Sequence, residues 1–201
     1  MQLSISKSSD RSGLGVLRSP APKPLSCCVA ILQDDAMTRD VAPLPLTAET
    51  FAPFGDVIEA SDRARRIPIN YGHTIRFDDL AELDVTEGGG HAIVSLFRAL
   101  PLSPPLLKVF ERHPLGSQAF VPLQGRPYLV AAAPAGEWDP TGVRLFRAEA
   151  GQGVNYRKGV WHHFLLALEA QSDFLVIDRA GPGDNLDEVQ LAEADQILVR
   201  L

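Results

Sequence analysis

Residues 111–125, ERHPLGSQAFVPLQG, and residues 151–162, GQGVNYRKGVWH, decide how this chain is expected to fold. Glu111 and His113 are two positions apart in the first stretch, and residues two apart on a strand face the same side. His162 ends the second stretch, soon after a glycine that suits a turn. We therefore expect Glu111 and His113 to point toward the same side of their strand.

The spacing of both stretches resembles the two motifs of the cupin superfamily. In a cupin, the first motif is His-x-His followed by a Glu and a Gly, and the second is Gly-x5-Pro-x-Gly-x2-His. In this chain Glu111 replaces the first His, Gln118 replaces the Glu and Arg157 replaces the Pro. The glycines are kept at Gly125, Gly151 and Gly159. The resemblance implies an all-β-dominated fold, a cupin-like double-stranded β-helix or jelly-roll barrel with a few short helices. It also implies that the side chains of Glu111, His113, Gln118 and His162 converge inside this barrel.

Composition narrows the class of protein. The chain has 201 residues, 45% of them hydrophobic, which is enough for one domain with a real core. A net charge of -6 gives no basic surface for nucleic acid, and no apolar run approaches the roughly 20 residues that cross a membrane. The two cysteines, Cys27 and Cys28, are adjacent and have no distant partner. This indicates a reducing compartment, so we expect a cytoplasmic protein.

Residues 1–36 differ from the remainder of the chain. They are rich in Ser, Pro, Lys and Arg and show little periodicity. A cleaved targeting segment and a disordered tail are two interpretations. We favour an over-long gene start, because Met37 is the only other methionine and regular patterning begins just after it. Residues 37–201 are then expected to form a single cupin-like catalytic domain.

Short apolar runs dominate the expected domain. Thr47 suits the N-cap of a short helix that Pro53 and Gly55 would end. A second short helix is expected within residues 187–198. Strands separated by turn residues at roughly 8–12-residue spacing are typical of a sandwich or barrel. The expected strands are residues 56–59, 67–71, 92–98, 106–111, 119–123, 128–133, 143–149, 163–169 and 174–178.

Glu111, His113, Gln118 and His162 are the candidate metal ligands. Imidazole, carboxylate and amide oxygen together suit a borderline divalent ion such as nickel, zinc, manganese or iron. Because an amide is a weak ligand, we expect the metal to be held loosely. The alternative interpretation is a set of interior residues without a metal, in which the histidines are hydrogen-bonded and Glu111 pairs with an arginine.

Other polar residues are weaker candidates. His162 fits the motif spacing, so His163, which would face the other way on a strand, is expected to be a structural or interface residue. Arg98 can clamp a substrate carboxylate, or it can be a solvated strand end. Asn70 can belong to a lid over the barrel mouth, although a plain turn explains it equally well. The other candidates for substrate binding are Gln118, Tyr156 and Lys158, and Asp178 is expected simply to pair with Arg179.

Five blocks of the sequence together resemble one family, the ureidoglycolate lyases, over roughly residues 44–190 and in the same order. The blocks are residues 54–58, 111–120, 153–156, 160–163 and 173–179. The resemblance implies a homodimeric enzyme of allantoin (purine) catabolism and nitrogen utilisation, which splits (S)-ureidoglycolate into glyoxylate and urea. It also implies Ni²⁺ as an associated cofactor and a small molecule as the substrate.

This reaction would suit the expected pocket. Removing the hydroxyl proton and protonating the departing urea nitrogen breaks the C–N bond without consuming water. We expect Glu111 or His113 to act as the base. His162 would either donate a proton to the nitrogen or ligate a metal, and Arg98 or Lys158 would hold the substrate carboxylate. The alternatives are another small-acid cupin enzyme, such as a sugar isomerase or a dioxygenase, a non-catalytic protein that binds glyoxylate, and a purely structural subunit.

Overall fold

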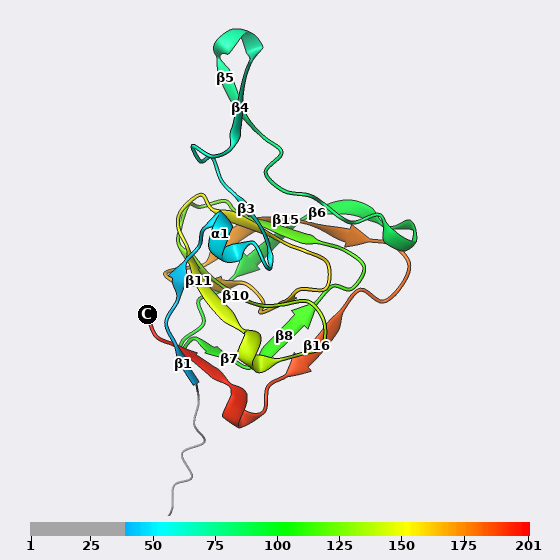
Figure 1. The fold of residues 1–201 in the computed structure, drawn as a ribbon. Helices are drawn as coiled ribbons and strands as arrows, with labels where there is room; N and C mark the ends of the chain where they lie inside the picture. The colour runs from blue at the N-terminus through cyan, green and yellow to red at the C-terminus, as the bar shows by residue number, and fades with distance from the viewer. Residues whose placement is uncertain (1–38) are drawn as a thin grey trace, which may run out of the picture. The chain divides into compact units, whose positions relative to one another are not determined.

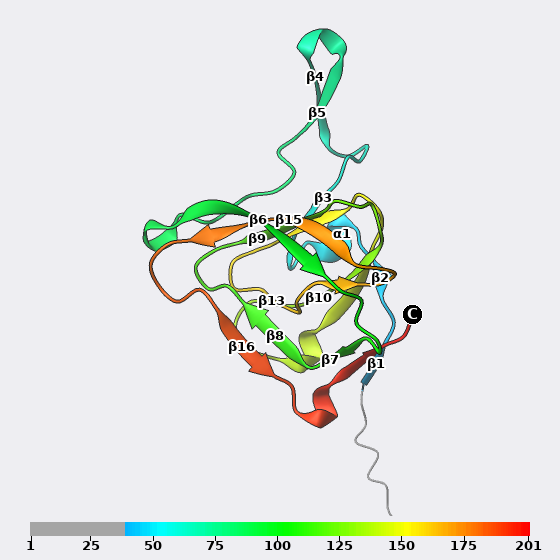
Figure 2. The ribbon, with the colours of Figure 1, turned by 180° about the vertical axis from the view of Figure 1, so that it is seen from behind.

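The computed structural model describes residues 39–201, so the predictions for residues 1–36 lie outside the described part of the chain. Strands dominate, and the helical elements are short. Figures 1 and 2 show two larger sheets, with the hairpin of β4 (Arg65–Ile69) and β5 (Thr74–Asp78) projecting away from them. Within residues 39–201, no helix is both long enough and apolar enough to cross a membrane.

In the described part of the chain, the strands and the α-helix have the following bounds: β1 Arg39–Val41, β2 Leu44–Pro45, α1 Ala48–Phe51, β3 Gly55–Ile58, β4 Arg65–Ile69, β5 Thr74–Asp78, β6 His91–Ala99, β7 Leu106–Leu107, β8 Val109–Arg112, β9 Gln118–Pro122, β10 Tyr128–Ala133, β11 Arg144–Ala148, β12 Gly153–Tyr156, β13 Trp161–His162, β14 Leu166–Ala167, β15 Ser172–Ala180, β16 Asp187–Gln190 and β17 Ile197–Val199. Four 3₁₀ turns join them, at Asn70–Gly72, Glu87–Gly89, Pro140–Gly142 and Glu193–Asp195.

Two sheets form the body of the fold. One has the order β16-β8-β13-β10-β11-β2, with β14 also paired to β10, and the other has the order β3-β12-β9-β15-β6. A small sheet, β1-β17-β7, and the β4–β5 hairpin complete the described elements. Apart from β10 and β11, neighbouring strands in the two larger sheets come from distant parts of the sequence, as in a jelly roll. The prediction of a strand-dominated, cupin-like β fold is confirmed.

Strand β10 explains why part of the sequence shows no alternation. All six of its residues are buried. Tyr128, Val130 and Ala132 pack into a core with residues of both larger sheets. The side chains that alternate with them, from Leu129 to Ala133, join a second core with residues of β7, β8 and β17. A strand covered on both faces is apolar throughout, so its sequence carries no polar face.

The first predicted helix is confirmed, and the second is wrong. Thr47 caps α1 through a capping box, in which its side chain accepts from the Thr50 backbone and the Thr50 side chain accepts in return. Residues 187–198 form β16, a 3₁₀ turn and β17 instead of a helix. β16 pairs with β8, while β17 pairs with β1 and β7. Tertiary pairing thus overrides the helix propensity of this polar segment.

Candidate active site

Strands β8 and β13 bring the first two candidate residues together. Glu111 and His162 are directly opposite each other in the antiparallel pairing of these strands. Side chains in such positions lie on the same face of the sheet. His162 Nδ1 is 3.9 Å from Oε1 of Glu111, which is contact distance without a hydrogen bond.

His113 has an oxygen atom within hydrogen-bond distance of each of its two ring nitrogens. Its Nδ1 lies 2.7 Å from the backbone carbonyl of Asn185, and its Nε2 lies 3.1 Å from Oε1 of Gln118. Because the Asn185 carbonyl only accepts, Nδ1 carries a proton, and in the neutral tautomer Nε2 then carries a lone pair, although Gln118 Oε1 is itself an acceptor. A backbone carbonyl that fixes the tautomer in this way is typical of a histidine that ligates a metal. Gln118 can turn its amide NH₂ toward the same lone pair when no ion is bound.

His162 is buried and neutral at neutral pH. Its ring stacks on Tyr156, with centroids 4.3 Å apart and planes 12° apart. Burial, followed by the nearby His113, lowers the pKa of His162 to about 3. Its Nε2 has no hydrogen-bond partner within residues 39–201. A neutral imidazole can offer a lone pair, but it is a poor proton donor, which favours the ligand or positioning role over the acid role.

Glu111 has the electrostatics of a group that exchanges protons. Burial raises the pKa of the Glu111 carboxyl; His113 opposes this shift and Glu188 reinforces it. Glu188 lies directly opposite Glu111 on β16, so Glu111 lies between a histidine and a second carboxylate. A carboxyl whose pKa rises toward the working pH is better suited to general acid–base catalysis.

The same cluster fits a divalent metal. Glu111, His113 and His162 each offer one ligand atom, and these atoms lie within 4.8 Å of one another. Two imidazoles and a carboxylate suit a borderline ion such as nickel or zinc. The buried Nε2 of His162, which has no partner in the described chain, is the observation that favours this fit. Gln118 adjoins the cluster through His113.

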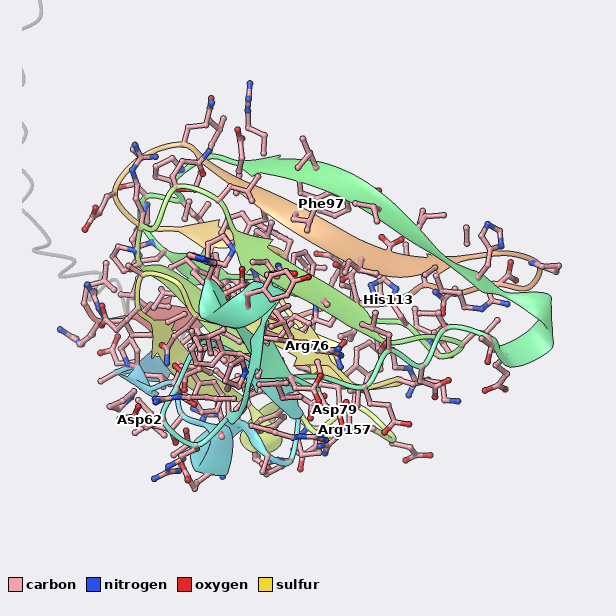
Figure 3. The ribbon with its side chains drawn as sticks, turned by 90° about the horizontal axis from the view of Figure 1, so that it is seen from above. Asp62, Arg76, Asp79, Phe97, His113 and Arg157 are labelled. Atoms are coloured by element: carbon pink, nitrogen blue, oxygen red, sulfur yellow. The ribbon has the colours of Figure 1, made fainter. Side chains whose placement is uncertain are left out.

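Two cavities reach the cluster. The larger, about 620 Å³, is bounded by the end of β6, by Glu111 and by apolar side chains that include Phe120 and Phe164. Phe97 of β6 lies on its wall, and Figure 3 shows this residue and His113 in the view from above. The smaller cavity, about 280 Å³, is more polar and includes His113 and Gln118. The cluster can therefore be approached by a small polar molecule.

The predicted substrate-binding residues lie in different surroundings. Arg98 lines the larger cavity, but its guanidinium forms two hydrogen bonds, of 2.7 and 3.0 Å, with Asp173. Lys158 is outside the cluster, in ion pairs with Asp84 and Glu87. Arg98 thus lies at a cavity wall, but its guanidinium already binds the carboxylate of Asp173. The ammonium group of Lys158 is likewise paired with protein carboxylates.

Asn70 is also away from the cluster. It lies in the 3₁₀ turn between β4 and β5, where it bonds to Thr74. Tyr156 is buried next to the cluster, where its ring stacks on His162, and it does not line either cavity. His163 is buried on the other side, against Phe110, as expected for a structural residue. Arg112, the neighbour of Glu111 in sequence, bonds to Asp187 and not to Glu111.

Sequence reasoning missed Asn185 and Glu188. The carbonyl of Asn185 orients His113, and its side chain accepts from the Leu115 backbone N–H. Glu188 was assigned to the expected helix. Its place opposite Glu111 depends on the pairing of β16 with β8, for which no local pattern gives a signal.

The fold and the cluster define a class of protein, a cupin-like β barrel with a Glu-His-His centre. Comparison with known proteins identifies the family: the ureidoglycolate lyase family model matches residues 38–198, and the chain belongs to that family. A ureidoglycolate lyase of Burkholderia mallei (strain NCTC 10229) is 56% identical over 151 residues, 75% of this chain and 88% of the relative. One from Pseudomonas putida (strain W619) is 50% identical over 157 residues, 77% of this chain and 93% of the relative.

Proposed function

We propose that this protein is a lyase that splits ureidoglycolate into glyoxylate and urea. The observation that carries the proposal is the convergence of Glu111, His113 and His162 within 4.8 Å, in a chain of the ureidoglycolate lyase family. Ureidoglycolate has a hydroxyl and a ureido nitrogen on one carbon. Its cleavage therefore needs one proton to move from oxygen to nitrogen.

Glu111 is the proposed carrier of that proton. Its carboxylate takes the proton from the substrate hydroxyl, the C–N bond breaks as the C=O bond of glyoxylate forms, and the urea nitrogen receives a proton. The raised pKa of Glu111 lets the carboxyl hold the proton between the two transfers. His113, fixed by the Asn185 carbonyl, and the neutral His162 position the substrate oxygen beside Glu111.

Glu111, His113 and His162 would hold a divalent ion such as Ni²⁺, with Gln118 as an additional, weaker ligand. When bound, the ion supplies a Lewis acid that polarises the substrate hydroxyl.

The direct experiment is a urea and glyoxylate release assay with purified protein and ureidoglycolate, with and without a chelator and added Ni²⁺. Equal release of both products supports the proposed reaction, and the chelator arm tests the need for a metal. Absence of both products in every arm would contradict the proposed function.

Metal binding gives a prediction that does not depend on turnover. Added Ni²⁺ should raise the thermal unfolding midpoint of chelator-treated protein, because an ion that binds only the folded state stabilises it, by about 2.7 kcal/mol at 100 times Kd. Scanning calorimetry with increasing Ni²⁺ measures this effect. His113→Asn should abolish the shift, whereas His73→Asn, on the hairpin, should keep it. A midpoint that does not respond in the unsubstituted protein would rule out the metal site.

We also propose a homodimer. Strand β6 is at the edge of its sheet and exposes Val94 (67% accessible) and Leu96 (69%), and Leu100 (68%) follows directly after the strand. Leu96 and Val94 pair across the strands with Leu175 and Ile177 of β15, so the apolar face continues on the neighbouring strand. A long apolar edge is normally covered by another chain or by protective residues. A second copy of this chain is the proposed cover.

Leu96→Asp should therefore convert the dimer to a monomer, because it puts a charge into the proposed interface. Light scattering coupled to size-exclusion chromatography gives the mass of each species. Leu83→Asp, at a partly exposed leucine outside β6, is the matched control and should stay dimeric. A dimer that persists in Leu96→Asp would place the interface elsewhere.

A further inference from the structure

The smaller cavity contains a carboxylate that the proposed proton transfer does not use. Asp178, on β15, lines this cavity together with His113 and Gln118. Its Oδ1 is buried and accepts no hydrogen bond from the described part of the chain. Because buried polar atoms are nearly always paired, an unpaired carboxylate oxygen that lines a cavity is a site where a donor group of a water molecule or a ligand can bind.

The strand register places Asp178 on the same face of the sheet as the cluster of Glu111, His113 and His162. In the register of β15 on β9, Val176 pairs with Phe120 and Ile177 pairs with Ala119. The next step of this antiparallel register puts Asp178 opposite Gln118. Opposite residues share a face, and Gln118 contacts His113, so Asp178 is on the same side of the sheet as the cluster.

Arg179 does not neutralise this carboxylate, so the predicted Asp178–Arg179 pair is wrong. The Arg179 guanidinium donates to the backbone carbonyls of Glu87 and Pro182, at 2.7 and 2.8 Å. Two glycines make room for its side chain: a Cβ at Gly90 would lie 2.3 Å from Arg179 Nε, and one at Gly116 would lie 2.7 Å from Arg179 Cβ. The guanidinium is therefore held away from its neighbour in sequence by close packing.

We propose that Asp178 binds the terminal NH₂ of the substrate's ureido group and so determines specificity. An ionised carboxylate only accepts, and the ureido end of the substrate supplies N–H donors. The same negative charge repels the carboxylate end, so the substrate enters with one orientation, the ureido group in the smaller cavity and the carboxylate toward the larger one. This inference rests on the proposed lyase function and names the group that recognises its substrate.

The test combines a substitution with two inhibitors. Oxalurate, the keto analogue of ureidoglycolate, has the ureido group, whereas glyoxylate lacks it. In Asp178→Asn, the KM for ureidoglycolate and the inhibition constant of oxalurate should each rise about tenfold or more, since a bond to a charged acceptor is lost. Inhibition by glyoxylate should stay within twofold, and the unfolding midpoint should stay equal or rise. Asp184→Asn, an exposed residue of the next loop, is the control and should match the unsubstituted enzyme.

Two results would overturn the inference. One is an Asp178→Asn variant with an unchanged KM and unchanged oxalurate inhibition. The other is an equal weakening of both inhibitors, which indicates general damage to the site. Failure of the unsubstituted protein to release urea is a different result, because it contradicts the lyase function itself.

Discussion

Glu111→Gln should reduce the rate of ureidoglycolate cleavage by about 10²–10⁴-fold, the range that a positioned proton-transfer group contributes. Glutamine keeps the shape of the side chain but cannot take the hydroxyl proton. Steady-state assays of urea release, with Ni²⁺ present, measure the change in kcat and KM. The loss should fall mainly on kcat, because the substrate is still bound when the proton transfer fails.

The same substitution should leave the fold as stable or more stable at neutral pH. A carboxyl whose pKa is raised in the folded state stabilises the fold below its unfolded pKa, and this contribution is lost as the pH rises through the folded pKa. At pH 7 Glu111 therefore opposes folding, and glutamine removes that opposition. Glu188→Gln is the matched control, and its activity should persist. The acidic limb of its pH–rate profile should shift to lower pH, because one cause of the raised pKa of Glu111 is gone. Less than a tenfold loss in Glu111→Gln would refute the proposed role of Glu111.

The sequence predicted those parts of the site that depend on local spacing. Glu111 lies on β8 and His113 follows directly after the end of that strand, so the spacing predicted their convergence although only Glu111 is within the strand. His162 follows a turn at Gly159, whose φ of 78° suits glycine. Each of these two features depends only on residues that are close together in the sequence. They could be interpreted without knowing which strands pair.

The missing parts depend on contacts between distant segments. Asn185 acts through its backbone carbonyl, and any residue carries that group, so its side chain gives no signal. Glu188 reaches Glu111 only because a polar segment with helix propensity pairs as β16. Asp178 was paired with Arg179 because they are adjacent, but the packing of Gly90 and Gly116 decides where the arginine goes.

The pH dependence of stability gives a second large expected effect. Burial, before any other cause, lowers the pKa of His162 to about 3 and of His163 to about 4. A histidine whose pKa is depressed in the folded state contributes stability above its unfolded pKa of about 6.5, and loses it as the pH falls toward the folded pKa. Each group then costs about 1.4 kcal/mol per pH unit below 6.5. Two of them should lower the free energy of unfolding by about 4 kcal/mol between pH 7.5 and pH 5.

Urea unfolding of the metal-free protein at both pH values measures this difference. His163→Gln should retain about half of it, since one of the two buried imidazoles is gone, while His91→Gln, at an exposed position, should retain all of it. The two variants separate the buried histidines from carboxylates such as Asp173, which both variants keep. A pH dependence that His163→Gln leaves unchanged would mean that His163 is accessible to protons in the folded state. The same burial keeps His162 neutral at pH 7, which is the protonation state in which an imidazole binds a metal. The measurement therefore also tests whether His162 is in the state that metal binding requires.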